Sequence, residues 1–174
     1  MMKRVVIIIL LAVVLGSSVA VIVYHNSKMQ NASNHLDPFL HAANGISVNL
    51  KDFLEGSEDA QEAALIGAKL YFDDLNQALD AVCAYGDEPD LFSNLTAALN
   101  LAHIRFISIF RAYLTNKTLS NMEDHAFLTG LKSSLDTMIN SMRNENGTLK
   151  SAVLTPDYFM ERIKEFVLSL RQCL

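Results

Sequence analysis

The sequence predicts an all-α fold, in which an N-terminal transmembrane helix precedes an up-and-down antiparallel bundle of four to five helices. Residues 5–23 contain no charged side chain, and a helix of this length rises about 28 Å, close to the roughly 30 Å thickness of a hydrocarbon core. From residue 36 onward, apolar residues recur at spacings of three and four, which places them on one face of a helix. No stretch shows the period of two that is typical of a half-buried strand.

The first segment, residues 5–24, is typical of an uncleaved signal anchor. Lys3 and Arg4 are the only charged side chains before it. The positive-inside rule therefore keeps residues 1–4 in the cytoplasm and sends the rest of the chain outside the cell membrane. With so few residues inside, we expect no cytoplasmic output domain in this chain.

The alternative is a cleaved signal peptide that leaves a secreted protein. Ser18 and Ala20 supply the small side chains that precede a cleavage site. The apolar run continues beyond that point to Tyr24, however, and cleavage there would leave an exposed apolar end. The uncleaved anchor is therefore the favoured interpretation.

The remaining chain divides into a polar, Asn-rich stalk over residues 25–35 and a bundle over residues 36–174. Asp37 followed by Pro38 predicts an N-cap and first turn, and Ser120 with Glu123 predicts a capping box for a later helix. The short connections between the helices favour antiparallel neighbours. The predicted helices span residues 38–55, 58–85, 89–115, 121–145 and 156–173.

Glycines predict where several of these helices end. Gly86 follows the second helix, and Asn146 with Gly147 follows the fourth. Asn44 with Gly45 is a dipeptide that often forms a turn, so the first helix could consist of two short pieces.

The helix over residues 89–115 is the most apolar of the five. Leu101, Ile104 and Ile107 lie beside its main apolar stripe, so we expect this helix to be contacted on more than one side. Leu99 and Phe106 on the stripe, together with Leu75 of the preceding helix, are the predicted core.

The charge of the outer part excludes two classes of partner. Beyond residue 24 there are 12 Lys and Arg against 19 Asp and Glu. This acidic balance, without a basic stripe, repels the phosphate backbone of nucleic acids and an anionic membrane surface. We expect no nucleic-acid partner, and contact with the membrane through residues 5–24 alone.

The sequence contains no motif that predicts chemistry. None of the five histidines follows a Glu at the spacing of a di-iron bundle, and no His-Glu-x-x-His, phosphate loop, dinucleotide fingerprint or nucleophile elbow is present. We therefore predict no catalytic residue, no cofactor and no metal site, and a protein that is not an enzyme.

His103 and Arg105 interrupt the most apolar helix and are the candidate ligand-binding residues. The simpler interpretation places both at the edge of the stripe, with Arg105 extended to solvent or paired with an acid of the second helix. The alternative is a pocket between helices in which Arg105 holds a carboxylate or phosphate with two hydrogen bonds.

The sequence also offers modification sites and two cysteines. Cys83 and Cys173 lie near the ends of the second and fifth helices. Because the helices are expected to alternate in direction, these two ends lie at opposite poles of the bundle, so we predict no disulfide between them.

Four Asn-x-Ser/Thr sequons would be glycosylated in a eukaryote, and elsewhere they are ordinary turn and cap residues. Their acceptor positions are Asn31, Asn94, Asn116 and Asn146.

These observations predict a non-catalytic, membrane-anchored module that displays a helical bundle outside the cell. It would bind a partner protein, form a homo-oligomer or serve as a subunit of an envelope complex. One alternative is a small-molecule-binding bundle that resembles extracytoplasmic sensor domains and needs a separate output partner. The other is a secreted four-helix signalling protein, if the leader is cleaved.

Overall fold

The computed structural model describes the backbone of residues 2–85, 88–119 and 121–174, and the side chains of these ranges from residue 17 onward except that of Pro156. In these ranges the regular secondary structure is helical, and the only β-type pairing is an isolated bridge between Arg143 and Leu149. The prediction of an all-α bundle is confirmed. The α-helices are α1 (Met2–Glu55), α2 (Glu58–Tyr85), α3 (Pro89–Asn116), α4 (Met122–Met142) and α5 (Pro156–Cys173), with a 3₁₀ helix, η1 (Ser151–Leu154), before α5.

The predicted bounds of α2, α3 and α5 agree with the structure to within one residue. Helix α4 is shorter than expected, because Arg143 adopts an extended conformation and pairs with Leu149. The N-cap of α4 is Asn121, whose side chain accepts a hydrogen bond from the Asp124 amide at 2.8 Å. The predicted capping residue Ser120 and the predicted stop Gly86 lie outside the described residues.

The first helix departs most from the prediction. It continues without a break through Pro38, and Asn44 with Gly45 forms no turn. Asp37 is not an N-cap: its carboxylate accepts a hydrogen bond from Ser33 and forms an ion pair with Arg143 at 2.7 Å. A contact with α4 thus uses the side chain that the local sequence assigned to a helix start.

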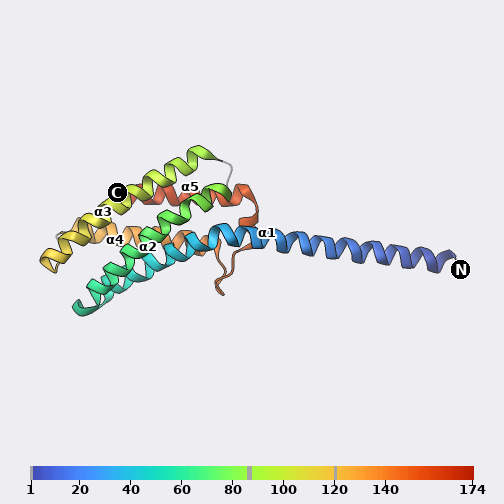
Figure 1. The fold of residues 1–174 in the computed structure, drawn as a ribbon, viewed down its shortest axis with the longest axis horizontal. Coiled ribbons are helices and arrows are strands. Elements are labelled where there is room, and N and C mark those ends of the chain that lie inside the picture. The colour runs from blue at the N-terminus through green and yellow to red at the C-terminus, as the bar shows by residue number, and fades with distance from the viewer. Residues whose placement is uncertain (1, 86–87, 120) are drawn as a thin grey trace.

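Residues 25–35 are consequently not a separate stalk. They are helical, and within them Ala32 is fully buried and Met29 packs against the core. The bundle therefore begins about one turn before Ala32. The part of α1 that precedes it projects from the bundle along the long axis of the molecule (Figure 1).

The helices alternate in direction. Helices α1, α3 and α5 run away from the projecting end, and α2 and α4 return towards it (Figure 1). Helix α1 packs mainly on α2 and also on α4, while α5 lies against both α4 and α3. This is the up-and-down arrangement that short connections favour.

The core lies where these helices meet. The predicted core residues Leu75, Leu99 and Phe106 are each no more than 1% exposed, which confirms the register of the apolar stripes. The Phe106 ring packs on Phe72, with 5.0 Å between ring centroids, and on Phe110. Aromatic side chains from α2 and α3 thus fill the centre of their interface.

Helices α1 and α2 approach each other closely at a glycine. A Cβ atom added to Gly45 would lie 2.4 Å from the ring of Tyr71, closer than any real contact. Gly45 therefore serves α1 by its small size, and the dipeptide that suggested a turn is a packing site instead.

We expect the overpacked contact that Gly45→Ala creates to cost about 1–3 kcal/mol. The higher helix propensity of alanine recovers about 1 kcal/mol of this, so the free energy of unfolding should fall by about 0–2 kcal/mol. Urea unfolding of the single and double variants measures it. In the Tyr71→Ala background, Gly45→Ala should be nearly neutral, because the ring that the new methyl group would meet is gone. If Gly45→Ala stabilises the protein, the close approach is wrong.

The two cysteines are free, as predicted. The Cys173 side chain lies against Gly130 of α4 at the C-terminal end of α5. Tyr85, two residues after Cys83, packs on Phe159 at the opposite end of α5, with 5.1 Å between ring centroids. The two thiols thus lie near opposite ends of the same helix.

Within the described residues, no helix combines the length and the apolar character needed to cross a membrane. Most of the segment that the sequence assigns to the anchor lies outside that search, because the side chains of residues 1–16 are not described.

Candidate functional site

His103 lies at the interface of α2 and α3. Its ring stacks on Phe72, with 5.1 Å between centroids, and its Nδ1 lies 3.3 Å from the Asn76 side-chain nitrogen. Because that nitrogen is a donor, Nδ1 accepts and the neutral ring carries its hydrogen on Nε2. The buried Nε2 has no hydrogen-bond partner among the described residues and lies 3.9 Å from the Asp73 carboxylate.

Burial lowers the pKa of His103, and the opposing effect of Asp73 is smaller. In the unfolded chain a histidine has a pKa of about 6.5. Below about pH 7 the unfolded state therefore binds more protons at this residue than the folded state does, and stability falls as the pH falls.

We expect the wild-type protein to lose more stability than His103→Gln when the pH is lowered from 7.5 to 5.5. The histidines at positions 25, 35, 41 and 125 are present in both proteins, so the difference between the two slopes isolates His103. Urea unfolding at the two pH values measures it. Equal slopes would show that the ring takes up its proton equally well in the folded and unfolded states.

Arg105 lies on a different side of α3. Its Nη1 donates hydrogen bonds to the main-chain oxygens of Cys173 and Leu174, at 3.3 and 2.6 Å. Its guanidinium carbon lies 4.7 Å from the centroid of the Phe127 ring of α4. A cation here complements the negative end of the α5 dipole. Arg105 therefore joins three helices and forms no pair with an acid of α2.

His103 and Arg105 do not form one site. His103 contacts α2, while Arg105 contacts α4 and α5. Two residues apart on a helix corresponds to a rotation of about 200°. Their side chains therefore do not converge on one pocket, and each has a packing role of its own.

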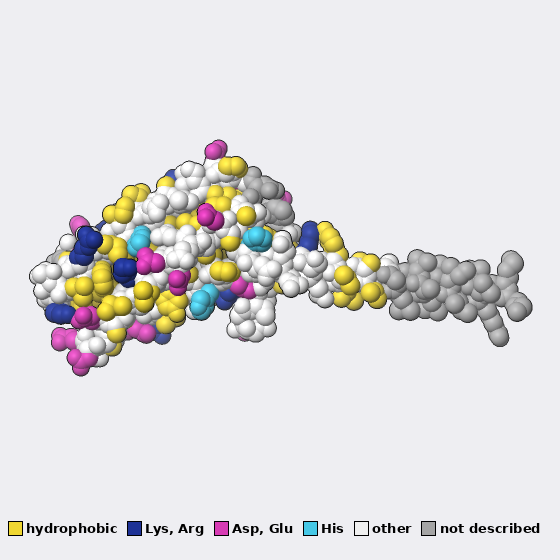
Figure 2. Space-filling model, viewed as in Figure 1, with side chains coloured by type: hydrophobic (Ala, Val, Ile, Leu, Met, Phe, Trp, Pro, Cys, Tyr) yellow, Lys and Arg dark blue, Asp and Glu magenta, His cyan; other side chains and the backbone are white. Residues whose placement is uncertain are grey.

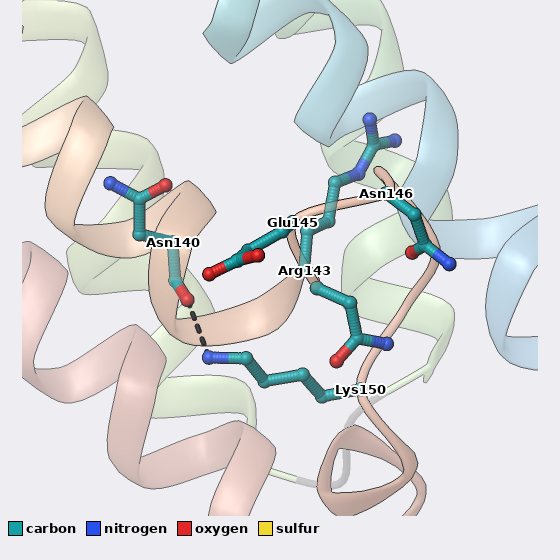
Figure 3. A pocket seen from close by; sticks show the side chains of 6 residues that line it. Asn140, Arg143, Glu145, Asn146 and Lys150 are labelled. Atoms are coloured by element: carbon teal, nitrogen blue, oxygen red, sulfur yellow. Dashed lines mark hydrogen bonds between the residues drawn. The ribbon is translucent and has the colours of Figure 1, made fainter.

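A hollow lies at the C-terminal end of α4 (Figure 3). Its volume is about 810 Å³, and it is lined by polar side chains of α4 and the following loop. Lys150 donates a hydrogen bond to the main-chain oxygen of Asn140 at 2.6 Å, which caps the end of α4. The guanidinium of Arg143 points away towards α1, where it meets Asp37. These contacts hold the loop against α4 and α1.

The described residues also lack a metal-binding cluster, since nowhere among them do three His, Cys, Asp or Glu side chains gather within reach of one ion.

Two polar contacts that the sequence did not suggest connect α1 to α4 and its C-cap, Arg143. They are the Asp37–Arg143 ion pair and a hydrogen bond from buried Ser47 to Asp136. Both depend on residues far apart in the chain, so no local sequence motif predicts them.

The four sequon asparagines differ in surroundings. Asn94 is engaged at both ends of its amide, by the Asp90 carbonyl and by Arg171. Asn146 is exposed in a turn where Gly147 has a φ of 81°, and its side-chain oxygen accepts from Thr148. Asn31 and Asn116 are exposed, on α1 and at the last residue of α3.

No known protein family, curated protein or solved structure shows a significant match to this chain.

Proposed function

We propose that this chain is a non-catalytic, membrane-anchored module that presents a helical bundle outside the cell for binding to another protein chain. Residues 5–24 would be the anchor, residues 1–4 would stay in the cytoplasm, and the bundle would be extracytoplasmic. The observation that carries the proposal is the continuity of α1, which is one 54-residue helix from Met2 to Glu55.

The exposed part of α1 has the surface expected of a lipid-facing helix. Val19, Val21, Ile22 and Val23 are each between 58% and 66% exposed, and together with the exposed Ala20 and Tyr24 they lie on all sides of the helix. A helix that is apolar all round is found in a protein core or in a membrane. Here the bundle does not cover these residues, which supports the membrane as their surroundings.

The return to water is marked on the same helix. The ammonium of Lys28 lies 5.0 Å from the centroid of the Tyr24 ring. Aromatic and basic side chains of this kind gather at membrane interfaces. Because α1 continues from this point into the bundle without a break, the anchor would hold the bundle at a fixed height and orientation.

The interior of the bundle supports binding through a surface rather than in a cavity. Its large apolar side chains are buried against one another, and the candidate ligand residues His103 and Arg105 are occupied by neighbours on separate sides. The sensor-like alternative needs a ligand pocket between helices, and nothing in the described residues favours it over surface binding.

Alkaline extraction of membranes from cells that make the full chain tests the anchor. We expect the protein to remain in the membrane pellet with its intact mass, and a variant that lacks residues 5–24 to move entirely to the soluble fraction. Val21→Arg is a milder change. An arginine costs about 2.5–3.5 kcal/mol of insertion free energy at the centre of a span. Because Val21 lies near the end of residues 5–24, we expect a smaller cost there. A full-length chain in the soluble fraction would contradict the proposal. A mature mass without the leader would favour the secreted alternative.

A further inference from the structure

Two Asn-Gly dipeptides occur in the chain, and the structure places them in opposite surroundings. Asn44 and Gly45 lie inside α1, where Gly45 is buried. Asn146 and Gly147 lie in the loop between α4 and η1. Residues 144–148 of this loop are exposed, and Figure 2 shows the loop as a projection from the bundle near the point where α1 leaves it. Solvent therefore reaches Gly147 and does not reach Gly45.

An Asn-Gly dipeptide can lose ammonia without an enzyme. The main-chain nitrogen of the glycine bonds to the side-chain carbonyl carbon of the asparagine, and the bond from that carbon to the side-chain nitrogen breaks. The proton of the glycine nitrogen passes through water to the departing ammonia, and a succinimide ring is left. A water molecule then opens the ring at either of its carbonyl carbons, which gives aspartate or isoaspartate. Water is the only other reactant.

Thr148 holds the Asn146 side chain in a state that favours this attack. The Asn146 side-chain oxygen accepts hydrogen bonds from the Thr148 hydroxyl at 2.7 Å and from the Thr148 main-chain amide at 3.1 Å. Negative charge develops on this oxygen when a nitrogen adds to the carbonyl carbon. Donors that are already directed at such an oxygen stabilise the transition state. The Thr148 hydroxyl is in turn held by the Asn144 side chain at 3.1 Å.

Gly147 supplies an unhindered nitrogen for the attack. Its φ is 81°, and no atom lies within 4 Å of the place that a Cβ would take. Its N–H donates a hydrogen bond to the Asn144 carbonyl at 2.9 Å, which must break before the nitrogen can react. This hydrogen bond closes an exposed turn and belongs to no helix, so it can open locally while the core stays intact.

The same dipeptide in α1 is held away from the reaction. The Gly45 nitrogen lies within a continuous helix, where it is hydrogen-bonded to the main chain one turn earlier. A Cβ atom at Gly45 would lie 2.4 Å from the Tyr71 ring, so the main chain has no room to rotate towards a ring closure. Asn44 can therefore react only when this part of α1 opens.

We propose that Asn146 is a site of spontaneous deamidation, and that the loop promotes the reaction through Thr148. The product places a new carboxylate beside Glu145, at the edge of the hollow at the end of α4. In the isoaspartate form it also adds a methylene group to the main chain between the bridge residues Arg143 and Leu149. Either product removes the sequon at this position. The inference does not depend on the proposed anchor.

Timed incubation of the full chain in detergent solution at mildly alkaline pH tests the site. Protease digestion, chromatography that separates the asparagine, aspartate and isoaspartate peptides, and fragmentation follow each position. We expect Asn146 to react several-fold faster than Asn44 in the folded protein. In urea Asn44 should accelerate until the two rates are similar, because the two dipeptides are chemically alike once the fold is lost. Asn146 should react no faster in urea than in the folded protein.

Two variants of Thr148 isolate the effect of its hydroxyl. Thr148→Val keeps the shape of the side chain without the hydroxyl and should slow the reaction of Asn146 several-fold in the folded protein. Thr148→Ser keeps the hydroxyl and should react like the wild type. In urea all three proteins should react alike, because the turn is gone.

Two results would overturn the proposal. If Asn146 reacts several-fold more slowly in the folded protein than in urea, or no faster than Asn44, the loop protects the asparagine instead of promoting its deamidation. If Thr148→Val reacts as fast as the wild type in the folded protein, the Thr148 hydroxyl has no part in the reaction.

Discussion

Replacing Phe106 with Ala lowers the free energy of unfolding of the bundle by about 3–5 kcal/mol, the usual cost of truncating a buried aromatic side chain. Phe106 is fully buried, and its ring packs between Phe72 of α2 and Phe110 of α3. Truncation leaves a cavity that these rings cannot fill without leaving their own contacts. Urea unfolding of residues 25–174 measures the change.

Leu70→Ala is the matched control for this prediction. Leu70 is 58% exposed on the outer face of α2, so its truncation should change the stability by no more than about 0.5 kcal/mol. A loss below about 1 kcal/mol for Phe106→Ala would mean that α3 is not central to the core.

A chain that begins at residue 38 is less stable than one that begins at residue 25 by about 3–5 kcal/mol, the sum expected for losing a buried leucine and a partner of a part-buried arginine. The shorter chain lacks Leu36, which is 1% exposed, and Ala32, which is fully buried. It also lacks Asp37, so Arg143 loses its ion pair. Urea unfolding of the two chains measures the difference.

A third chain, beginning at residue 29, provides the control. Residues 25–28 are exposed on all sides, so their removal should leave the stability nearly unchanged. If the chain from residue 38 is as stable as the other two, the segment 25–37 is a stalk after all, and its packing in the bundle is wrong.

Most of the fold could be predicted from sequence because its signals are local. Apolar spacings of three and four fixed the buried faces, and Pro at the first turn marked the starts of α3 and α5. These signals act within a few residues of one another. Leu75, Leu99 and Phe106 were identified as core for the same reason.

The start of the bundle could not be predicted in this way. Asp37 with Pro38 is a strong local signal for a helix start, but Asp37 is 106 residues away from Arg143, which pairs with it across the bundle. In the same way, the polar composition of residues 25–35 gave no sign that Ala32 is buried and Met29 partly buried. A tertiary contact overrides local preference, and nothing in the neighbouring sequence reports it.

The candidate site shows a different kind of error. His103 and Arg105 were singled out correctly as interruptions of an apolar helix, but a separation of two residues points their side chains to opposite sides of it, about 200° apart. Helical geometry alone could have separated them. By contrast, the excess apolar residues Leu101 and Ile104 were visible in the sequence, and only the structure shows that the bundle leaves them uncovered.

The height of the bundle above a membrane tests the central claim most directly. From Tyr24 to Glu55, α1 is one unbroken helix, and 31 residues at 1.5 Å each rise about 47 Å. Energy transfer from a dye on Ser57→Cys to acceptors at the bilayer surface, with the full chain in vesicles and the native cysteines replaced, measures this height. An anchored, continuous helix predicts a single distance near 45–50 Å when it stands along the bilayer normal. A broad distribution of distances that extends to short values would contradict a continuous, rigid α1 between the bilayer and the bundle. An absence of energy transfer, with the protein free in solution, would contradict the anchor.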